Sequence, residues 1–137
     1  TIRRTPRPQD LTGMSTQELR DTFQITNLFV PGELRGHFTD LDRLVVGGVM
    51  PTGKAIELPN HKETGRAFFL ERRELGAINI GGAGKVLADG QSFSLEKLDC
   101  VYLPMGTKSV SFSSNDANNP TKGYFLECPA HSAHPGP

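Results

Sequence analysis

The chain has 137 residues, and its 15 Lys and Arg balance its 15 Asp and Glu, so the formal net charge is zero. This length fits about one domain with one hydrophobic core. A neutral chain without a basic block lacks the charge pattern of a nucleic-acid-binding protein. No apolar stretch approaches the roughly 18 residues of a membrane-spanning helix, so neither nucleic acid nor a membrane is predicted as a partner.

The first 14 residues include three arginines, two prolines and a glycine, and are interpreted as an arm without a core of its own. They contain no apolar run of the kind that a signal peptide needs. The capping-box pattern Ser15-Thr16-Gln17-Glu18 then predicts a helix that runs through Leu19 to about Phe23. It is the single helix that the sequence predicts.

After Pro31-Gly32 the sequence pattern is typical of an all-β protein. Short runs of alternating apolar and polar residues are separated by Gly, Pro, Asn and Asp. The predicted strands are Leu34–Phe38, Arg43–Met50, Lys54–Leu58, Ala67–Leu75, Gly76–Ile80, Lys85–Ala88, Gln91–Leu95, Asp99–Leu103, Ser109–Ser113 and Gly123–Cys128. Asp89-Gly90 predicts a tight hairpin, because both residues tolerate the positive φ of a type I′ turn. Many short strands indicate a β-sandwich or small barrel rather than a doubly wound α/β sheet.

The two cysteines, Cys100 and Cys128, are too few for a disulfide framework and fit a reducing cytoplasm. Cys100 lies in an apolar run and is interpreted as a buried thiol that acts as a small hydrophobic residue. The glycine-rich segment Gly81–Lys85 fails as a phosphate loop, because Asn79 and Val86 occupy positions that need Gly and Ser or Thr. We interpret it as a turn between strands.

The histidines do not predict a metal site. His131 and His134 form an H-x-x-H pattern between two prolines, on extended chain and without a third ligand nearby. His37 and His61 are far away in the sequence. The roles of His131 and His134 stay open.

The segment from Gly65 to Gly76 mixes charged and apolar residues. A strand would place Leu70, Arg72 and Glu74 on one face and Glu71, Arg73 and Leu75 on the other. One interpretation is cross-strand ion pairing or an oligomer contact. The other is a barrel lining, in which Arg72 or Arg73 binds an anionic ligand and Glu71 or Glu74 acts as acid or base.

This segment resembles part of the two-motif pattern of cupin jelly rolls. Gly65 and Gly84 match glycines of the first motif, but Glu71 and Arg73 stand where that motif has its metal-binding histidines. Pro104-Met105-Gly106 matches the start of the second motif, and Ser109 replaces its histidine. Because Arg and Ser are poor substitutes for neutral imidazole, no metal is expected in this chain.

A more specific resemblance rests on Phe68–Gly84, with the sequence FFLERRELGAINIGGAG. It resembles a hallmark of the 5-keto-4-deoxyuronate isomerases of pectin breakdown, also called 4-deoxy-L-threo-5-hexosulose-uronate ketol-isomerases. The likeness covers most of the chain from about residue 15 to 131. Further matching segments in the same order are Glu18–Arg20, Asp42–Pro51, Asp89–Gln91 and Pro129–His131.

The resemblance implies that this chain is the N-terminal half of a protein with two cupin domains that assembles as a homohexamer. Residues 15–128 would be a cupin-type jelly-roll domain with one short N-terminal helix, and residues 129–137 a tail or the start of an interdomain linker. The family's zinc site of three histidines and a glutamate lies in the C-terminal domain, and no residue here matches it. The implied partners are the C-terminal cupin domain and sister subunits.

The implied function is a cytoplasmic isomerase, an intramolecular oxidoreductase, that interconverts 5-keto-4-deoxyuronate and 3-deoxy-D-glycero-2,5-hexodiulosonate. This half alone is expected to be inactive. Arg72 or Arg73 would bind the uronate carboxylate if this domain borders a neighbouring active site, and Glu71 and Glu74 are the acid or base candidates. The alternative is a non-catalytic cupin for oligomer assembly or sugar-acid binding. A free-standing cupin dioxygenase is disfavoured, because both motifs lack histidine ligands.

Overall fold

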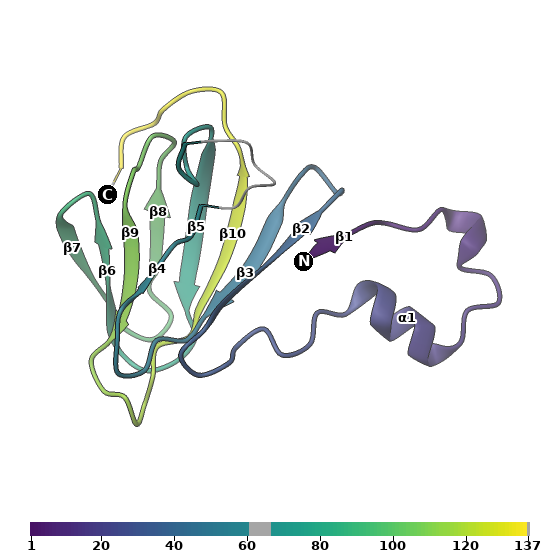
Figure 1. Ribbon diagram of the computed structural model, residues 1–137, viewed down its shortest axis with the longest axis horizontal. Helices are drawn as coiled ribbons and strands as arrows, with labels where there is room; N and C mark the ends of the chain where they lie inside the picture. Colours follow the sequence, from purple (N-terminus) through teal and green to yellow (C-terminus); the bar gives the residue numbers. More distant parts are fainter. Residues whose placement is uncertain (61–66, 137) are drawn as a thin grey trace.

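Two β-sheets face each other across one core in the computed structural model, which describes residues 1–60 and 67–136 (Figure 1). The strands are β1 Ile2–Arg3, β2 Leu34–Thr39, β3 Val45–Val49, β4 Ile56–Glu57, β5 Arg73–Asn79, β6 Gly84–Ala88, β7 Gln91–Leu95, β8 Cys100–Leu103, β9 Val110–Ser114 and β10 Gly123–Pro129. One sheet has the order β1-β2-β3-β10-β5-β8 and the other β4-β9-β6-β7. The predicted all-β sandwich is confirmed.

The core lies between the sheets because each strand sends alternate side chains inward. Phe112 on β9 and Phe125 on β10 come from opposite sheets, are at most 1% exposed and both belong to the core cluster. Gly47 on β3 makes room for the Phe125 ring, since a Cβ at this position would lie 2.0 Å from the ring's Cζ. The absence of a side chain at Gly47 therefore lets the Phe125 ring lie over the neighbouring strand of the same sheet.

The predicted capping box is confirmed in the N-terminal segment. This segment also contains two elements that were not predicted. Ser15 Oγ accepts the Glu18 amide at 3.2 Å, and the Glu18 carboxylate accepts the Ser15 amide at 2.7 Å. The helix α1, Thr16–Phe23, has no buried residue and lies apart from the sandwich (Figure 1). Two short elements, β1 and a 3₁₀ turn at Pro8–Asp10, escaped prediction because two or three residues carry no periodicity. No helix in the described part of the chain is long and apolar enough to cross a membrane.

The prediction of two separate strands, Ala67–Leu75 and Gly76–Ile80, is wrong. A single strand, β5, runs across the boundary between them. Residues 67–72 instead form turns. The Glu71 carboxylate accepts the Ala67 amide at 2.9 Å, and Phe69 and Leu70 are both buried. An extended strand with one face on the core would turn one of two successive side chains outward, whereas this turn buries both.

The Asp89-Gly90 hairpin is confirmed, with φ of +46° and +82° between the paired residues Ala88 and Gln91. Asp89 also fixes the neighbouring strand β9. Its Oδ1 accepts the amides of Lys108 at 3.0 Å and Ser109 at 2.9 Å.

The predicted glycine-rich turn between β5 and β6 is also confirmed, and Asn79 organises it. This side chain is fully buried and donates from Nδ2 to the carbonyls of Gly82 at 2.8 Å and Leu95 at 3.0 Å. Its Oδ1 accepts the amides of Gly81 at 3.0 Å and Lys122 at 3.3 Å. The segment is therefore a structural corner, in which one carboxamide satisfies backbone groups from several parts of the chain.

We expect Asn79→Ala to lower the free energy of unfolding by about 3 kcal/mol, because it leaves buried amides and carbonyls without partners. Urea unfolding followed by circular dichroism measures the change. Asn118→Ala, at an exposed position in the loop between β9 and β10, is the control and should stay within about 0.5 kcal/mol of the parent chain. Equal losses for the two variants would show that the corner does not depend on Asn79.

Candidate functional site

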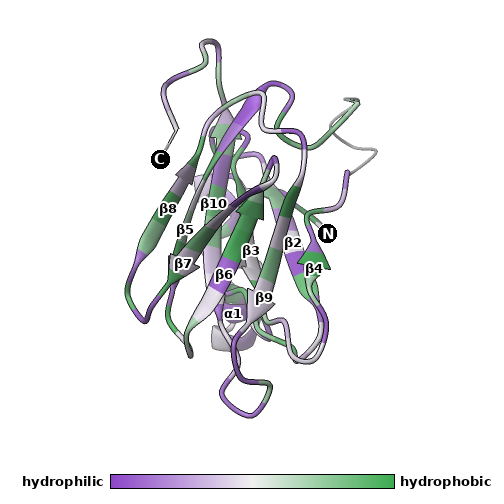
Figure 2. Ribbon diagram, turned by 90° about the vertical axis from the view of Figure 1, so that its left-hand side faces the viewer, coloured by the Kyte–Doolittle hydropathy of each residue, from purple (hydrophilic) through white to green (hydrophobic). Residues whose placement is uncertain are grey.

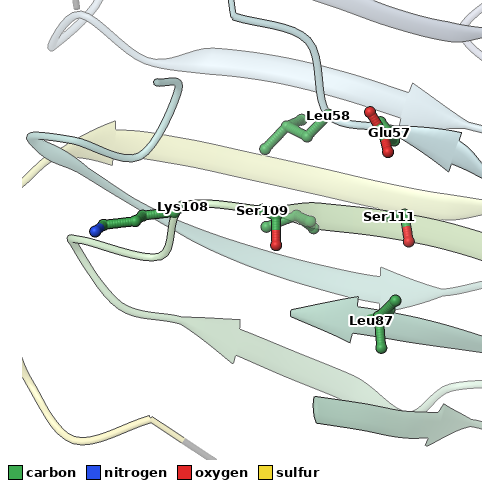
Figure 3. A pocket seen from close by; sticks show the side chains of 7 residues that line it. Glu57, Leu58, Leu87, Lys108, Ser109 and Ser111 are labelled. Carbon is green, nitrogen blue, oxygen red and sulfur yellow. The ribbon is translucent and has the colours of Figure 1, made fainter. Parts of the chain in front are cut away.

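One surface hollow of about 180 Å³ lies beside β4 and β9 and contains none of the predicted site residues. Figure 3 shows Glu57 and Lys108 at opposite ends of it, with Ser109 between them. Leu58 and Leu87 add apolar lining on either side of the strand that carries Ser111 (Figure 3). Because its charged groups do not converge on one point, the hollow offers no evident centre for catalysis.

The four predicted site residues lie in four different environments. Arg73 and Glu74 begin β5, so the alternation of the strand points Arg73 into the sandwich and Glu74 outward. Glu71 closes the turn at Ala67. Arg72 has an exposed side chain, and its carbonyl accepts the Ala130 amide at 3.0 Å. The structure therefore does not gather the four side chains into one site.

Inside the sandwich, Arg73 forms an ion pair with Glu127 on the neighbouring strand β10. The Glu127 side chain is fully buried and that of Arg73 is 13% exposed. The guanidinium also donates to the backbone carbonyl of Arg43, and burial lowers its pKa. The cross-strand ion-pairing interpretation of this segment is thus observed for Arg73, whose charge is already matched by an internal carboxylate.

On the outer face, Glu74 lies between a phenol and a thiol. Its Oε2 accepts the Tyr102 hydroxyl of β8 at 2.7 Å, and its Oε1 lies 3.7 Å from the Cys128 Sγ of β10. The hydrogen bond to Glu74 raises the pKa of Tyr102, and burial together with the Glu74 charge raises that of Cys128. We call these three residues the Glu74 cluster. Sequence reasoning missed it because the partners lie 28 and 54 residues from Glu74.

Cys100 is exposed, so the interpretation of it as a buried thiol is wrong. Val101 and Leu103 on the same strand point into the core, and the alternation of β8 therefore turns Cys100 and Tyr102 outward. Apolar neighbours in sequence do not bury a residue on the outer face of a sheet. Cys100 and Cys128 are both free thiols.

The cupin metal positions of this chain do not fit a metal ion. Glu71 and Arg73 have the separate partners described above, and Ser109 Oγ contacts the Asp89 carboxylate at 3.4 Å. Gly65, the first residue of the motif, lies outside the described residues, as does His61. His131 and His134 are exposed in the tail after β10. Within residues 1–60 and 67–136, no three His, Cys, Asp or Glu side chains group as metal ligands would.

Several solved structures that are similar to this chain are cupin domains. The cupin domain of an XRE family transcriptional regulator from Enterobacter cloacae superposes with a TM-score of 0.55 at 14% identity, covering 72% of this chain and 97% of that one. The Cnp3 cupin domain of Schizosaccharomyces pombe gives 0.53 at 14% identity, over 70% and 63% of the two chains. Such low identity establishes the fold alone, and the fold is a cupin β-sandwich. No protein-family model matches the chain.

Curated relatives share far more sequence. A 4-deoxy-L-threo-5-hexosulose-uronate ketol-isomerase from Levilactobacillus brevis is 45% identical over 128 residues, which are 93% of this chain and 46% of that protein. The protein of the same name from Opitutus terrae is 44% identical over 131 residues, 95% of this chain and 47% of its own length. The chain matches half of a uronate ketol-isomerase. The resemblance of Phe68–Gly84 to that family is thereby confirmed, and the chain spans about half the length of these relatives.

We expect Arg73→Met alone and Glu127→Leu alone each to lower the free energy of unfolding by about 3–5 kcal/mol, because each leaves a buried charge without its partner. The double variant should lose less than either single one, since no charge then stays buried. Urea unfolding of all four proteins completes the cycle. Additive losses in the double variant would contradict the coupling of the pair.

The Glu74 cluster predicts slow alkylation of Cys128. The thiolate is the reactive form, and the raised pKa of the folded Cys128 lowers its thiolate fraction relative to an ordinary cysteine at the same pH. In a Cys100→Ser background, Glu74→Gln should increase the iodoacetamide rate by removing the carboxylate charge, whereas Glu57→Gln should not. Mass spectrometry gives the rates, and equal rates for the two variants would rule out an effect of Glu74.

The raised pKa values of Tyr102 and Cys128 also predict how the stability of the fold depends on pH. Because Tyr102 and Cys128 hold their protons more tightly when folded, their contribution is complete below their ordinary pKa values. It is lost as the pH rises through the raised values, and the chain should therefore be less stable in alkali.

Proposed function

We propose that this chain is the N-terminal domain of a two-domain isomerase that interconverts 5-keto-4-deoxyuronate and 3-deoxy-D-glycero-2,5-hexodiulosonate in the degradation of pectin and related uronides. The observation that carries the proposal is the 44–45% identity to uronate ketol-isomerases over at least 93% of the chain. Identity of this level along the whole cupin sandwich supports a common role for the domain in these proteins.

The role of this domain is support rather than chemistry. Moving a carbonyl along a sugar acid requires a proton or a hydride to pass between adjacent carbons, so an acid-base group or a metal must face the substrate. The interior of this sandwich holds the core cluster around Phe112 and Phe125 and the ion pair of Arg73 with Glu127. It therefore leaves the reacting centre to the other half of the parent protein.

The parent protein would bind zinc through that other half, because the metal positions of this half hold Glu71, Arg73 and Ser109 with partners of their own. The parent would work in the cytoplasm as a homohexamer of two-domain subunits. Of the two arginines predicted to bind the uronate carboxylate, Arg72 has the exposed side chain, while Arg73 is paired with Glu127. Arg72 is thus the better candidate at a border with a neighbouring active site.

We expect the two-domain parent to convert 5-keto-4-deoxyuronate and residues 1–137 alone to show no turnover, since the reacting centre lies outside this half. Proton NMR of the product measures conversion, and elemental analysis measures zinc in each protein. The homologous protein from Caldicellulosiruptor bescii, 44% identical to this chain, is the positive control.

Two outcomes would contradict the proposal. Turnover or stoichiometric zinc in residues 1–137 alone would place the chemistry in this domain. A parent that binds the uronate without converting it would instead favour the alternative of a non-catalytic cupin for sugar-acid binding or assembly.

A further inference from the structure

Gly76, in the middle of β5, is a strand glycine that no contact inside the fold explains. A Cβ on Gly84 would lie 2.0 Å from Thr121 Oγ1, and one on Gly123 would lie 2.8 Å from Val49 Cγ1, so these positions need glycine. A Cβ on Gly76 would meet no atom within 4 Å, and its φ is not in the left-handed region. Because glycine weakens a strand interior and often marks the close approach of another group, Gly76 points to something outside this chain.

The missing side chain creates a hollow on the outer face of the six-stranded sheet. Gly76 pairs with Tyr102 on β8 and with Leu126 on β10, and these two side chains rise on either side of it. The hollow measures about 430 Å³, more than twice the volume of the one in Figure 3, and Cys100 and Ile78 extend it. We call it the Gly76 groove.

The Gly76 groove has the composition of an interface. Leu126 is 42% exposed although it is apolar, and Ile78 and the exposed Cys100 line the groove with it. The wall formed by β8 is at the edge of the sandwich (Figure 2). The Glu74 cluster supplies a polar rim at one end, because Tyr102 belongs to both the groove and the cluster. An apolar centre with a polar rim is the usual anatomy of a docking surface.

The C-terminal tail leads to this groove. After β10 the Ala130 amide is held by the Arg72 carbonyl, and the tail crosses the end of the sandwich (Figure 1). Gly136 then lies against Pro104, the residue that follows β8, since a Cβ on it would be 3.4 Å from the proline ring. The described chain thus reaches the end of the β8 wall. The relatives are about twice as long as the matched region, so a domain that follows this tail would start beside the groove and be tethered there at high effective concentration.

We propose that the Gly76 groove is the docking surface for the second domain of the parent protein, which inserts an apolar side chain over Gly76. This inference rests on the proposed function, because it takes the other half of a two-domain protein as the occupant. The tether favours that half over a second copy of this chain, which would have to associate from solution.

The first test is the reactivity of Cys100 in the wall of the groove. We expect iodoacetamide to label Cys100 at least about tenfold more slowly in the parent protein than in residues 1–137, because the docked domain covers the thiol. A cysteine placed by Ser94→Cys on the exposed face of β7, in a Cys100→Ser background, is the control and should react equally in both. Equal reactivity of Cys100 in the two proteins would overturn the proposal.

The second test blocks the groove without disturbing the core. Gly76→Arg projects into open space and should leave the urea midpoint of residues 1–137 nearly unchanged, yet restore Cys100 labelling in the parent protein. Ser92→Arg, at an exposed position of the other sheet, adds a similar side chain and should leave Cys100 protected. Continued protection in the Gly76→Arg parent would contradict docking at this groove.

The occupant is identified by incorporating the photo-cross-linking residue p-benzoylphenylalanine in place of Ile80 of the parent, because Ile80 is 41% exposed and lies outside the groove, two residues after the lining residue Ile78. A cross-link within one polypeptide, with the mass of a single chain on a denaturing gel, supports the proposal, whereas a product of doubled mass shows a second copy and overturns it. None of these measurements uses turnover. Protection of Cys100 in a parent without isomerase activity would therefore refute the proposed function alone.

Discussion

The alternation of side chains along β5 is the constraint on which the rest of the molecule depends. Its inward positions place Leu75 and Ala77 in the core and Asn79 at the buried corner, while Glu74 and Gly76 face outward. A shift of one residue would exchange the two sets and bury the Glu74 carboxylate in place of Leu75. Since β5 pairs with β10 on one side and β8 on the other, its register also fixes which residues of those strands line the outer surface.

Features governed by neighbours in sequence could be predicted from the sequence. The Ser15–Glu18 capping box and the Asp89-Gly90 hairpin need only residues within a few positions of each other, and both were right. The failures involve partners that are distant in the chain. The start of β5 depends on how Phe69 and Leu70 are buried, and the exposure of Cys100 depends on which face of β8 meets the core.

In the candidate site, too, the sequence indicated single residues but not their partners from distant parts of the chain. Glu74 and Arg73 were singled out as unusual charges on a strand, but their roles follow from Tyr102, Cys128 and Glu127 on neighbouring strands. No local pattern announces such pairs, because the sheet register that joins them is set by the whole core. The family resemblance was readable for a different reason, since a block of seventeen consecutive residues is specific without any knowledge of the fold.

The short strand β1 changes how this protein can associate with itself. By pairing in parallel with Phe38 and Thr39 of β2, and with Asp40 accepting the Thr5 amide, the arm occupies one end of the six-stranded sheet. The two edge strands of this sheet in the described part of the chain are therefore β1, which has two residues, and β8. A very short edge strand presents few unpaired backbone groups to another chain. The arm therefore blunts one edge of the sheet against pairing with a second molecule, although it adds almost nothing to the core.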